Sequence, residues 1–150
     1  MDMIRPLLPP AALCCAIALS ACHRSDEHGG HVVDSVTEAF AGIGEDETIH
    51  FTGTEPFWGG EVASGQLRYT TPDDPQGAAI AVNRFAGNNG LGFSGELDGQ
   101  RFHMAVTPGK CSDGMSDRLY PYVVTLDVHG EQREGCAWTD KQKFEGPQTP

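Results

Sequence analysis

The chain has 150 residues and a formal net charge of −11 at pH 7, with 21 acidic against 10 basic side chains. This length gives room for one domain with its own hydrophobic core. So acidic a chain is not expected to bind nucleic acid or an anionic membrane surface, because both would repel it. The charge suits a soluble body or a protein that meets a cationic partner.

Residues 1–21 have the features of a lipoprotein signal peptide. A weakly cationic start is followed by an apolar run over 7–19, which is too short to span a bilayer as a helix. The tetrapeptide LSAC at 19–22 then has the form of a bacterial lipobox, in which small residues precede a cysteine that accepts diacylglycerol. The sequence predicts that Cys22 is lipidated and becomes the mature N-terminus. An ordinary secretory signal with a chance cysteine is the alternative.

The residue after the lipidated cysteine sorts such lipoproteins between membranes. Here it is His23 rather than aspartate, which resembles the class anchored in the outer membrane and facing the periplasm. That compartment oxidises thiols. Because Cys22 carries lipid and two earlier cysteines lie in the signal peptide, Cys111 and Cys136 are expected to form a disulfide. Two unpaired buried thiols are the alternative.

Residues 22–47 are predicted to form a tether, because a polar, glycine-containing stretch begins them and an acidic run ends them. Its three histidines are expected to be solvated rather than to bind a metal. Four apolar residues recur within it at three- and four-residue spacing, which indicates a short amphipathic helix: Val33, Val36, Phe40 and Ile43.

From residue 48 onward, short alternating runs are separated by glycine or proline, which predicts strands rather than helices. The candidate strands cover 49–52, 61–63, 66–71, 78–85, 93–97, 100–104, 122–128 and 132–138. We therefore expect a mostly β domain over 48–138, built as a small antiparallel β-barrel or strongly curled sheet, with at most one short N-terminal helix. Residues 139–150 are predicted to be a flexible tail.

The clearest local signal is Asp98-Gly99, a dipeptide typical of a two-residue type I′ hairpin turn. A two-residue turn determines the register of the hairpin. The expected pairs are Glu96 with Arg101, Ser94 with His103, and Phe93 with Met104. This register puts six residues on one, apolar face: Phe93, Gly95, Leu97, Phe102, Met104 and Val106.

Two predicted loops combine polar groups with aromatic or apolar side chains and form the candidate binding surface. Its residues are Glu55, Phe57, Trp58, Asp113, Met115, Ser116, Asp117 and Tyr120. Glu55 is expected to be a buried carboxylate bonded to nearby backbone N–H groups, and Trp58 has a core position as its alternative. For Asp113 and Asp117, turn hydrogen bonds are favoured over calcium binding.

No serine lies in a GxSxG or SxxK motif, so the sequence predicts no enzyme and no catalytic residue. One hydrolase hypothesis stays open. It places Asp113, Ser116 or Asp117 near His103 as a base.

Three segments resemble an uncharacterised family of Gram-negative envelope lipoproteins: GTEPFW at 53–58, LRYTTPD at 67–73, and the C-x-D-x-M-S…Y-P…G-C pattern within 111–137. That family is similar in build to META-domain heat-shock lipoproteins and, more distantly, to membrane-bound inhibitors of C-type lysozyme. The resemblance covers about residues 48–138. It implies a small β-barrel-like domain without known enzymatic activity. The lysozyme-inhibitor branch normally carries a Ser-Gly-Ser-Gly-Ala-Arg-Tyr-type loop, which this chain lacks.

Together these features predict a non-enzymatic lipoprotein, anchored in the outer membrane and facing the periplasm, with an envelope-maintenance or binding role. Its partner would be a protein or small molecule of unknown identity, and no cofactor or metal is expected. The first alternative is a protein inhibitor of a cationic hydrolase such as lysozyme, because acidity favours association with a basic enzyme. The second is a periplasmic hydrolase.

Overall fold

The computed structural model describes residues 38–147, in which the regular structure is nine β-strands without a helix. No helix in this range is long and apolar enough to cross a membrane. The mostly β class predicted from the sequence is confirmed. The strands are β1 (Ile49–Thr54), β2 (Phe57–Ala63), β3 (Gln66–Thr70), β4 (Ala78–Ala81), β5 (Asn83–Ala86), β6 (Leu91–Leu97), β7 (Gln100–Cys111), β8 (Tyr120–Val128) and β9 (Glu131–Thr139).

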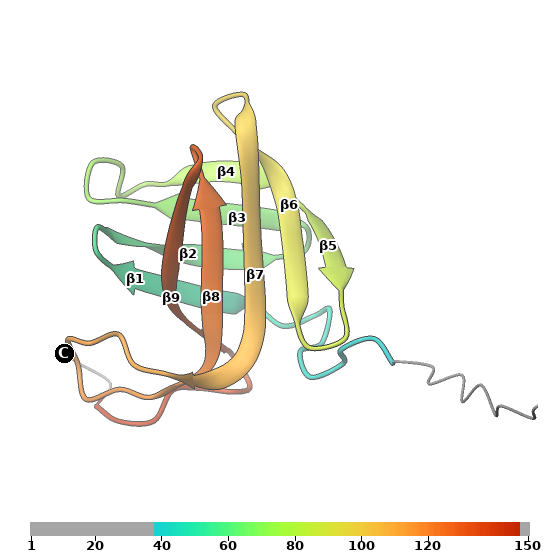
Figure 1. Cartoon of the computed structure of the whole chain (residues 1–150), viewed down its shortest axis with the longest axis vertical. Coiled ribbons are helices and arrows are strands. Elements are labelled where there is room, and N and C mark those ends of the chain that lie inside the picture. Colours follow the sequence, from blue (N-terminus) through green and yellow to red (C-terminus); the bar gives the residue numbers. More distant parts are fainter. Residues whose placement is uncertain (1–37, 148–150) are drawn as a thin grey trace, which may run out of the picture. The chain divides into compact units, whose positions relative to one another are not determined.

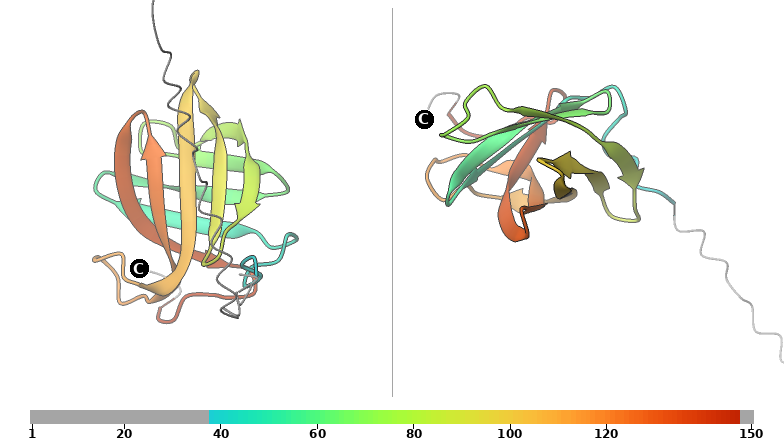
Figure 2. Two further views of the ribbon diagram at one scale, coloured as in Figure 1. Left: turned by 45° about the vertical axis from the view of Figure 1, so that its right-hand side comes forward. Right: turned by 90° about the horizontal axis from the view of Figure 1, so that it is seen from above.

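All nine strands form one antiparallel sheet in the order β4-β3-β2-β1-β9-β8-β7-β6-β5. The sheet curls until β1–β4 run across β6–β9, which makes a nearly closed barrel (Figures 1 and 2). Strands such as β1 and β8 bury alternate residues between these two layers. The hydrophobic core therefore fills the inside of the barrel.

The edge strands β4 and β5 are consecutive in sequence, yet they lie at opposite ends of the sheet order. A single strand over 78–85 was predicted, and this is wrong. The chain leaves the ladder at Val82, whose N–H donates to the carbonyl of Gly65 at 2.9 Å. β4 then pairs with β3, and β5 pairs with β6. One residue thus carries the chain from one layer to the other.

Two-residue turns with both residues in the left-handed region join three of the hairpins. Asp98 and Gly99 have φ values of 52° and 74°, as a type I′ turn requires. The same conformation recurs at 64–65 and 129–130. These turns twist with the strands that they connect, so they support the curl of the whole sheet.

The predicted register of the β6–β7 hairpin is confirmed at all three pairs: Glu96 with Arg101, Ser94 with His103, and Phe93 with Met104. The apolar side chains assigned to one face are buried in the core. The turn type and the alternation of apolar residues predict the same register for this hairpin. Their agreement explains why this hairpin could be derived locally.

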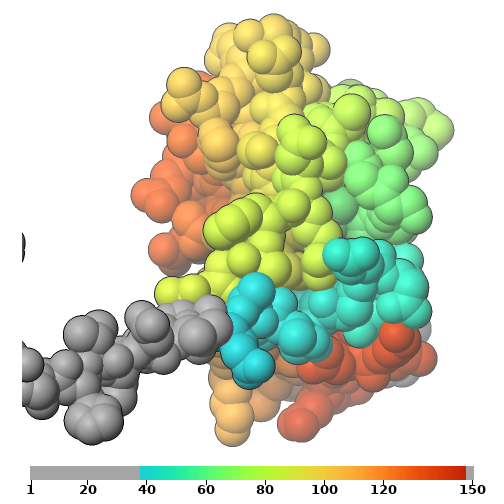
Figure 3. Space-filling view, turned by 90° about the vertical axis from the view of Figure 1, so that its right-hand side faces the viewer, coloured from blue at the N-terminus to red at the C-terminus, as the bar shows by residue number. Residues whose placement is uncertain are grey.

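Residues 38–47 belong to the folded domain rather than to the predicted tether. Phe40 lies in irregular backbone and Ile43 in a bend instead of a helix, and Val33 and Val36 are outside the described residues. The N–H of Phe40 donates to the carbonyl of Gly87 at 2.7 Å, and Ile43 is buried in the core. Figure 3 shows this segment, in cyan, seated between β5 and the C-terminal segment. Burial against the barrel, rather than helical periodicity, explains its apolar residues.

The predicted flexible tail is also wrong over 139–147. Thr139 is buried at the end of β9, and its hydroxyl oxygen accepts a hydrogen bond from the N–H of Gln142. Glu145 pairs with Leu119 through two backbone hydrogen bonds. The ring of Phe144 packs against those of Tyr120 and Trp138. The C-terminal segment therefore closes one end of the barrel.

Candidate functional site

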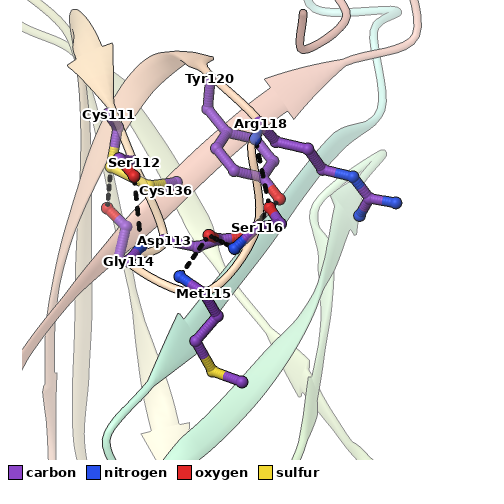
Figure 4. Close-up of a disulfide and its surroundings, with 10 residues drawn as sticks. Cys111, Ser112, Asp113, Gly114, Met115, Ser116, Arg118, Tyr120 and Cys136 are labelled. Atoms are coloured by element: carbon purple, nitrogen blue, oxygen red, sulfur yellow. Dashed lines mark hydrogen bonds between the residues drawn. A yellow bond between two sulfur atoms is a disulfide. The ribbon is translucent and has the colours of Figure 1, made fainter. Parts of the chain in front are cut away.

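The loop from residue 111 to 119 leaves β7 and returns as β8. Its first residue, Cys111, forms a disulfide with Cys136 of β9, with the two Cα atoms 5.5 Å apart. β7 and β9 are not neighbours in the sheet order, so the bridge adds a direct link between them and ties the loop to the sheet (Figure 4). The disulfide predicted from the sequence is confirmed.

Asp113 organises the loop through both oxygens of its carboxylate. Oδ1 accepts hydrogen bonds from the backbone N–H groups of Met115 at 3.0 Å and Ser116 at 2.8 Å. Oδ2 accepts from the hydroxyls of Ser116 at 2.7 Å and Tyr120 at 3.0 Å. Figure 4 shows these groups converging on one carboxylate. The loop is thus pinned at its first residue by a covalent bond and in its middle by four hydrogen bonds.

The charge of Asp113 is stabilised by the same contacts. Burial raises the pKa of this carboxyl, but the hydrogen bonds from Ser116, Met115 and Tyr120 outweigh it and bring the pKa to about 2. Asp113 is therefore ionised at neutral pH, and its acceptor positions are occupied by the loop itself. Within residues 38–147, no three His, Cys, Asp or Glu side chains are grouped so that they could hold a metal ion.

The outer side of the loop presents apolar side chains to solvent. Met115 is 68 % exposed, and Leu119 is also exposed. Asp117 is exposed beside them. Met115 and Asp117 belong to the predicted candidate surface and are exposed, whereas Leu119 was not among the predicted residues.

Tyr120 was predicted as part of that surface, but it is buried. Its ring packs against Trp138 and Phe144, with ring centroids 5.5 and 5.4 Å apart. The guanidinium of Arg118 lies 4.6 Å above the Phe144 ring. The C-terminal segment supplies Phe144, which explains why the sequence around Tyr120 does not reveal its burial. Tyr120 supports the loop from beneath.

The second predicted loop is the tight turn between β1 and β2, which contains a cis Glu55-Pro56 peptide bond. Glu55 is exposed, so the prediction of a buried carboxylate is wrong. Phe57 is 52 % exposed, whereas Trp58 is only 4 % exposed and belongs to the core. Neighbouring residues of a strand point to opposite faces, so the side chain of Phe57 faces solvent and that of Trp58 faces the core.

Trp58 lies inside the barrel near Phe51 and Tyr69, at ring-centroid distances of 6.0 and 6.4 Å. Two glycines make room for it. A Cβ on Gly53 would overlap the indole ring, and a Cβ on Gly135 would lie 2.9 Å from its Cζ2 atom. The tryptophan of the 53–58 motif is therefore a core residue fitted to two glycines.

The eight predicted surface residues do not form one site. A hollow of about 230 Å³ beside the 111–119 loop is lined by Lys110, Leu119, Tyr120, Pro121, Lys143 and Glu145. A separate hollow of about 300 Å³ near Phe57 is lined by residues of β1, β2, β3 and the loop that follows β3. The two hollows share no lining residue. The structure thus offers two candidate surfaces.

The hydrolase hypothesis required His103 near the loop. His103 and Cys111 lie in the same strand, eight residues apart, which corresponds to roughly 26 Å at the rise of an extended strand. His103 pairs instead with Asp127 of β8. The Ser116 hydroxyl donates to Asp113, not to a histidine. The predicted grouping of these residues with His103 is wrong.

One structurally important carboxylate was missed by the sequence analysis. Glu47 ends an acidic run that looks solvated, yet its side chain is only 7 % exposed. Its carboxylate accepts hydrogen bonds from the N–H of Gly44 at 2.9 Å and the hydroxyl of Thr139 at 2.7 Å. These two bonds, in that order, lower the pKa of Glu47. The sequence alone does not distinguish Glu47 from its acidic neighbours, because the hydroxyl that it binds lies 92 residues away.

Comparison of the chain with protein-family models, with curated proteins and with solved structures found no match. The resemblance to envelope lipoproteins therefore stays a prediction. The two surfaces described above carry the functional argument.

Proposed function

We propose that this chain is a lipid-anchored, non-enzymatic binding protein of the cell envelope, held at the outer membrane through Cys22 with its β domain in the periplasm. The lipobox at 19–22 and His23 after it support the anchor and its location. The Cys111–Cys136 disulfide supports an oxidising compartment, because disulfides persist there. These observations favour a tethered domain that meets its partner near the membrane.

The observation that carries the binding role is the 111–119 loop. A disulfide and the Asp113 hydrogen bonds hold its backbone, while Met115 and Leu119 are left exposed. Ordering a mobile loop on binding costs free energy, and a loop that is already ordered avoids much of this cost. A rigid loop with an exposed apolar tip is thus suited to contact a partner.

The anchor is tested by intact-mass spectrometry of the membrane fraction. We expect a lipid adduct on Cys22, and we expect Cys22→Ser to abolish it. Release of the unmodified wild-type chain into the soluble fraction would disprove the anchor.

The binding loop is tested separately by site-specific photo-crosslinking in living cells. A photoreactive p-benzoylphenylalanine at the position of Met115 should give a discrete adduct. The same residue at the position of Phe85 is the control, because Phe85 is 70 % exposed on β5 and outside the loop. Equal patterns at the two positions, or no adduct from position 115, would count against the loop as a binding surface.

One observation favours a second function, inhibition of a cationic hydrolase such as lysozyme. The net charge of −11 accelerates and strengthens association with a basic protein. The purified chain should then slow lysozyme in a turbidity assay at equimolar amounts, and more weakly at high salt. An unchanged rate of lysis rejects this alternative.

A further inference from the structure

The hollow near Phe57 lies on the outer face of three neighbouring strands. Thr52 of β1, Gly59 of β2 and Thr70 of β3 are register partners across the sheet. In each strand these residues alternate with buried ones, so they face outward. Gly59 has no side chain, and the two flanking threonines therefore border a depression in the sheet surface.

Phe57 forms a wall of this depression. It lies two residues before Gly59 in β2 and so shares its outward face. It is the register partner of Thr54 across the tight turn. Thr71 and Pro72, which follow β3, complete the lining at the same end of the strands (Figure 1). The result is a hollow of about 300 Å³ with one exposed aromatic ring and three threonines, also bordered by Gly53 and the buried Trp58.

The lining contains no ionisable side chain, although 21 % of the whole chain is charged. Three other hollows in residues 38–147 differ in this respect. Each of them has ionisable side chains in its lining. These are Glu45, Glu47 and Arg84 in the first hollow, Lys110, Lys143 and Glu145 in the second, and Glu96, Arg101 and His103 in the third. A ligand matched to the hollow near Phe57 is therefore uncharged.

We propose that this hollow binds a neutral oligosaccharide. A pyranose ring has an apolar face of C–H groups, which matches the exposed Phe57 ring, and a rim of hydroxyls that both donate and accept hydrogen bonds. Threonine hydroxyls have the same dual capacity. This arrangement of an aromatic ring with a few polar groups in a shallow hollow satisfies both parts of the sugar. The site is separate from the 111–119 loop, so either assignment can fail alone.

The test is a calorimetric titration of the full-length protein with chitotriose and with maltotriose, in a detergent without a sugar head group. We expect at least one of these neutral probes to bind with a Kd of about 1 mM or tighter. Phe57→Ala should weaken binding by about tenfold, because the apolar contact is lost. The matched control is Phe85→Ala, which removes another exposed aromatic ring outside the hollow and should leave the Kd unchanged.

A second pair of variants tests the hydroxyls without changing side-chain shape. Thr70→Val should weaken binding severalfold, whereas Thr125→Val on β8, outside the hollow, should not. Circular dichroism of each variant confirms that it is folded. Absence of binding by both probes up to about 10 mM overturns the proposal. Equal effects of Phe57→Ala and Phe85→Ala also overturn it.

Discussion

The carboxylate of Asp113 receives hydrogen bonds from two backbone N–H groups and two hydroxyls, all within the loop that it organises. Asp113→Asn keeps the size of the side chain but removes the negative charge and one acceptor oxygen. Hydrogen bonds to charged groups are worth about 1.5–3 kcal/mol each, so we expect a loss of about 1–3 kcal/mol in the free energy of unfolding, measured with urea.

The pH dependence of stability provides an independent check on Asp113. Its pKa falls from 3.8, the ordinary value, to about 2 in the folded protein. A lowered pKa stabilises the fold above the ordinary value, and this contribution disappears as the pH drops from about 4 to 2. Asp113→Asn should lack this part of the acid dependence. Asp117→Asn, at an exposed position in the same loop, is the control and should behave as the wild type. Identical acid profiles for all three proteins would show that Asp113 does not anchor the loop.

Gly135 matters through the space that it leaves empty. A Cβ there would overlap the carbonyl oxygen of Thr52 and lie 2.9 Å from Trp58. Gly135→Ala should therefore destabilise the protein by about 1–3 kcal/mol, as overpacking does. Gly92→Ala is the matched control, because a Cβ on Gly92 would meet nothing within 4 Å. Its effect should stay within about 0.5 kcal/mol. Equal urea midpoints for the two variants would contradict the packing described for Trp58.

At the level of elements, the disulfide links β7 to β9, which are not neighbours in the sheet order, and joins residues with a sequence separation of 25. Cross-linking restricts the unfolded chain, so the double variant Cys111→Ser/Cys136→Ser should lose about 2–5 kcal/mol in the free energy of unfolding. Replacing both cysteines avoids a free thiol. The reduced wild-type protein is the control and should match the variant.

Thiol counting on the denatured, unreduced protein checks the bridge itself. Neither Cys111 nor Cys136 should react with a thiol reagent before reduction. Two reactive thiols would mean that the loop has no covalent anchor.

For the whole molecule, one continuous sheet around one core predicts a single cooperative unfolding transition. The two tryptophans can test this because they report different places. Trp58 is in the core, and Trp138 packs on His50, Tyr120 and Phe144 near the C-terminal segment. Trp58→Phe leaves Trp138 as the fluorophore, and Trp138→Phe leaves Trp58. Within each variant, the urea midpoint from fluorescence should equal the midpoint from far-UV circular dichroism. An earlier transition at Trp138 would identify the C-terminal segment as a separately unfolding unit.

What the sequence by itself determined is local. The Asp98-Gly99 turn and the alternation on either side of it specify the β6–β7 register, because turn conformation and side-chain period both depend on neighbouring residues. The Cys111–Cys136 pair was reached by counting cysteines and by the predicted compartment. Repeated short strands were enough to indicate a curled antiparallel sheet.

What only the tertiary structure decided involves partners far apart in the chain. Val82 breaks a strand because β4 and β5 pair in different layers, and no local signal marks that position. Tyr120 is buried by Phe144, and Glu47 is buried through Thr139. The outward Phe57 forms a hollow only with residues of β1 and β3. Burial and site geometry depend on which strands and loops contact one another. The order of residues along the chain does not give the distances between them in the folded protein.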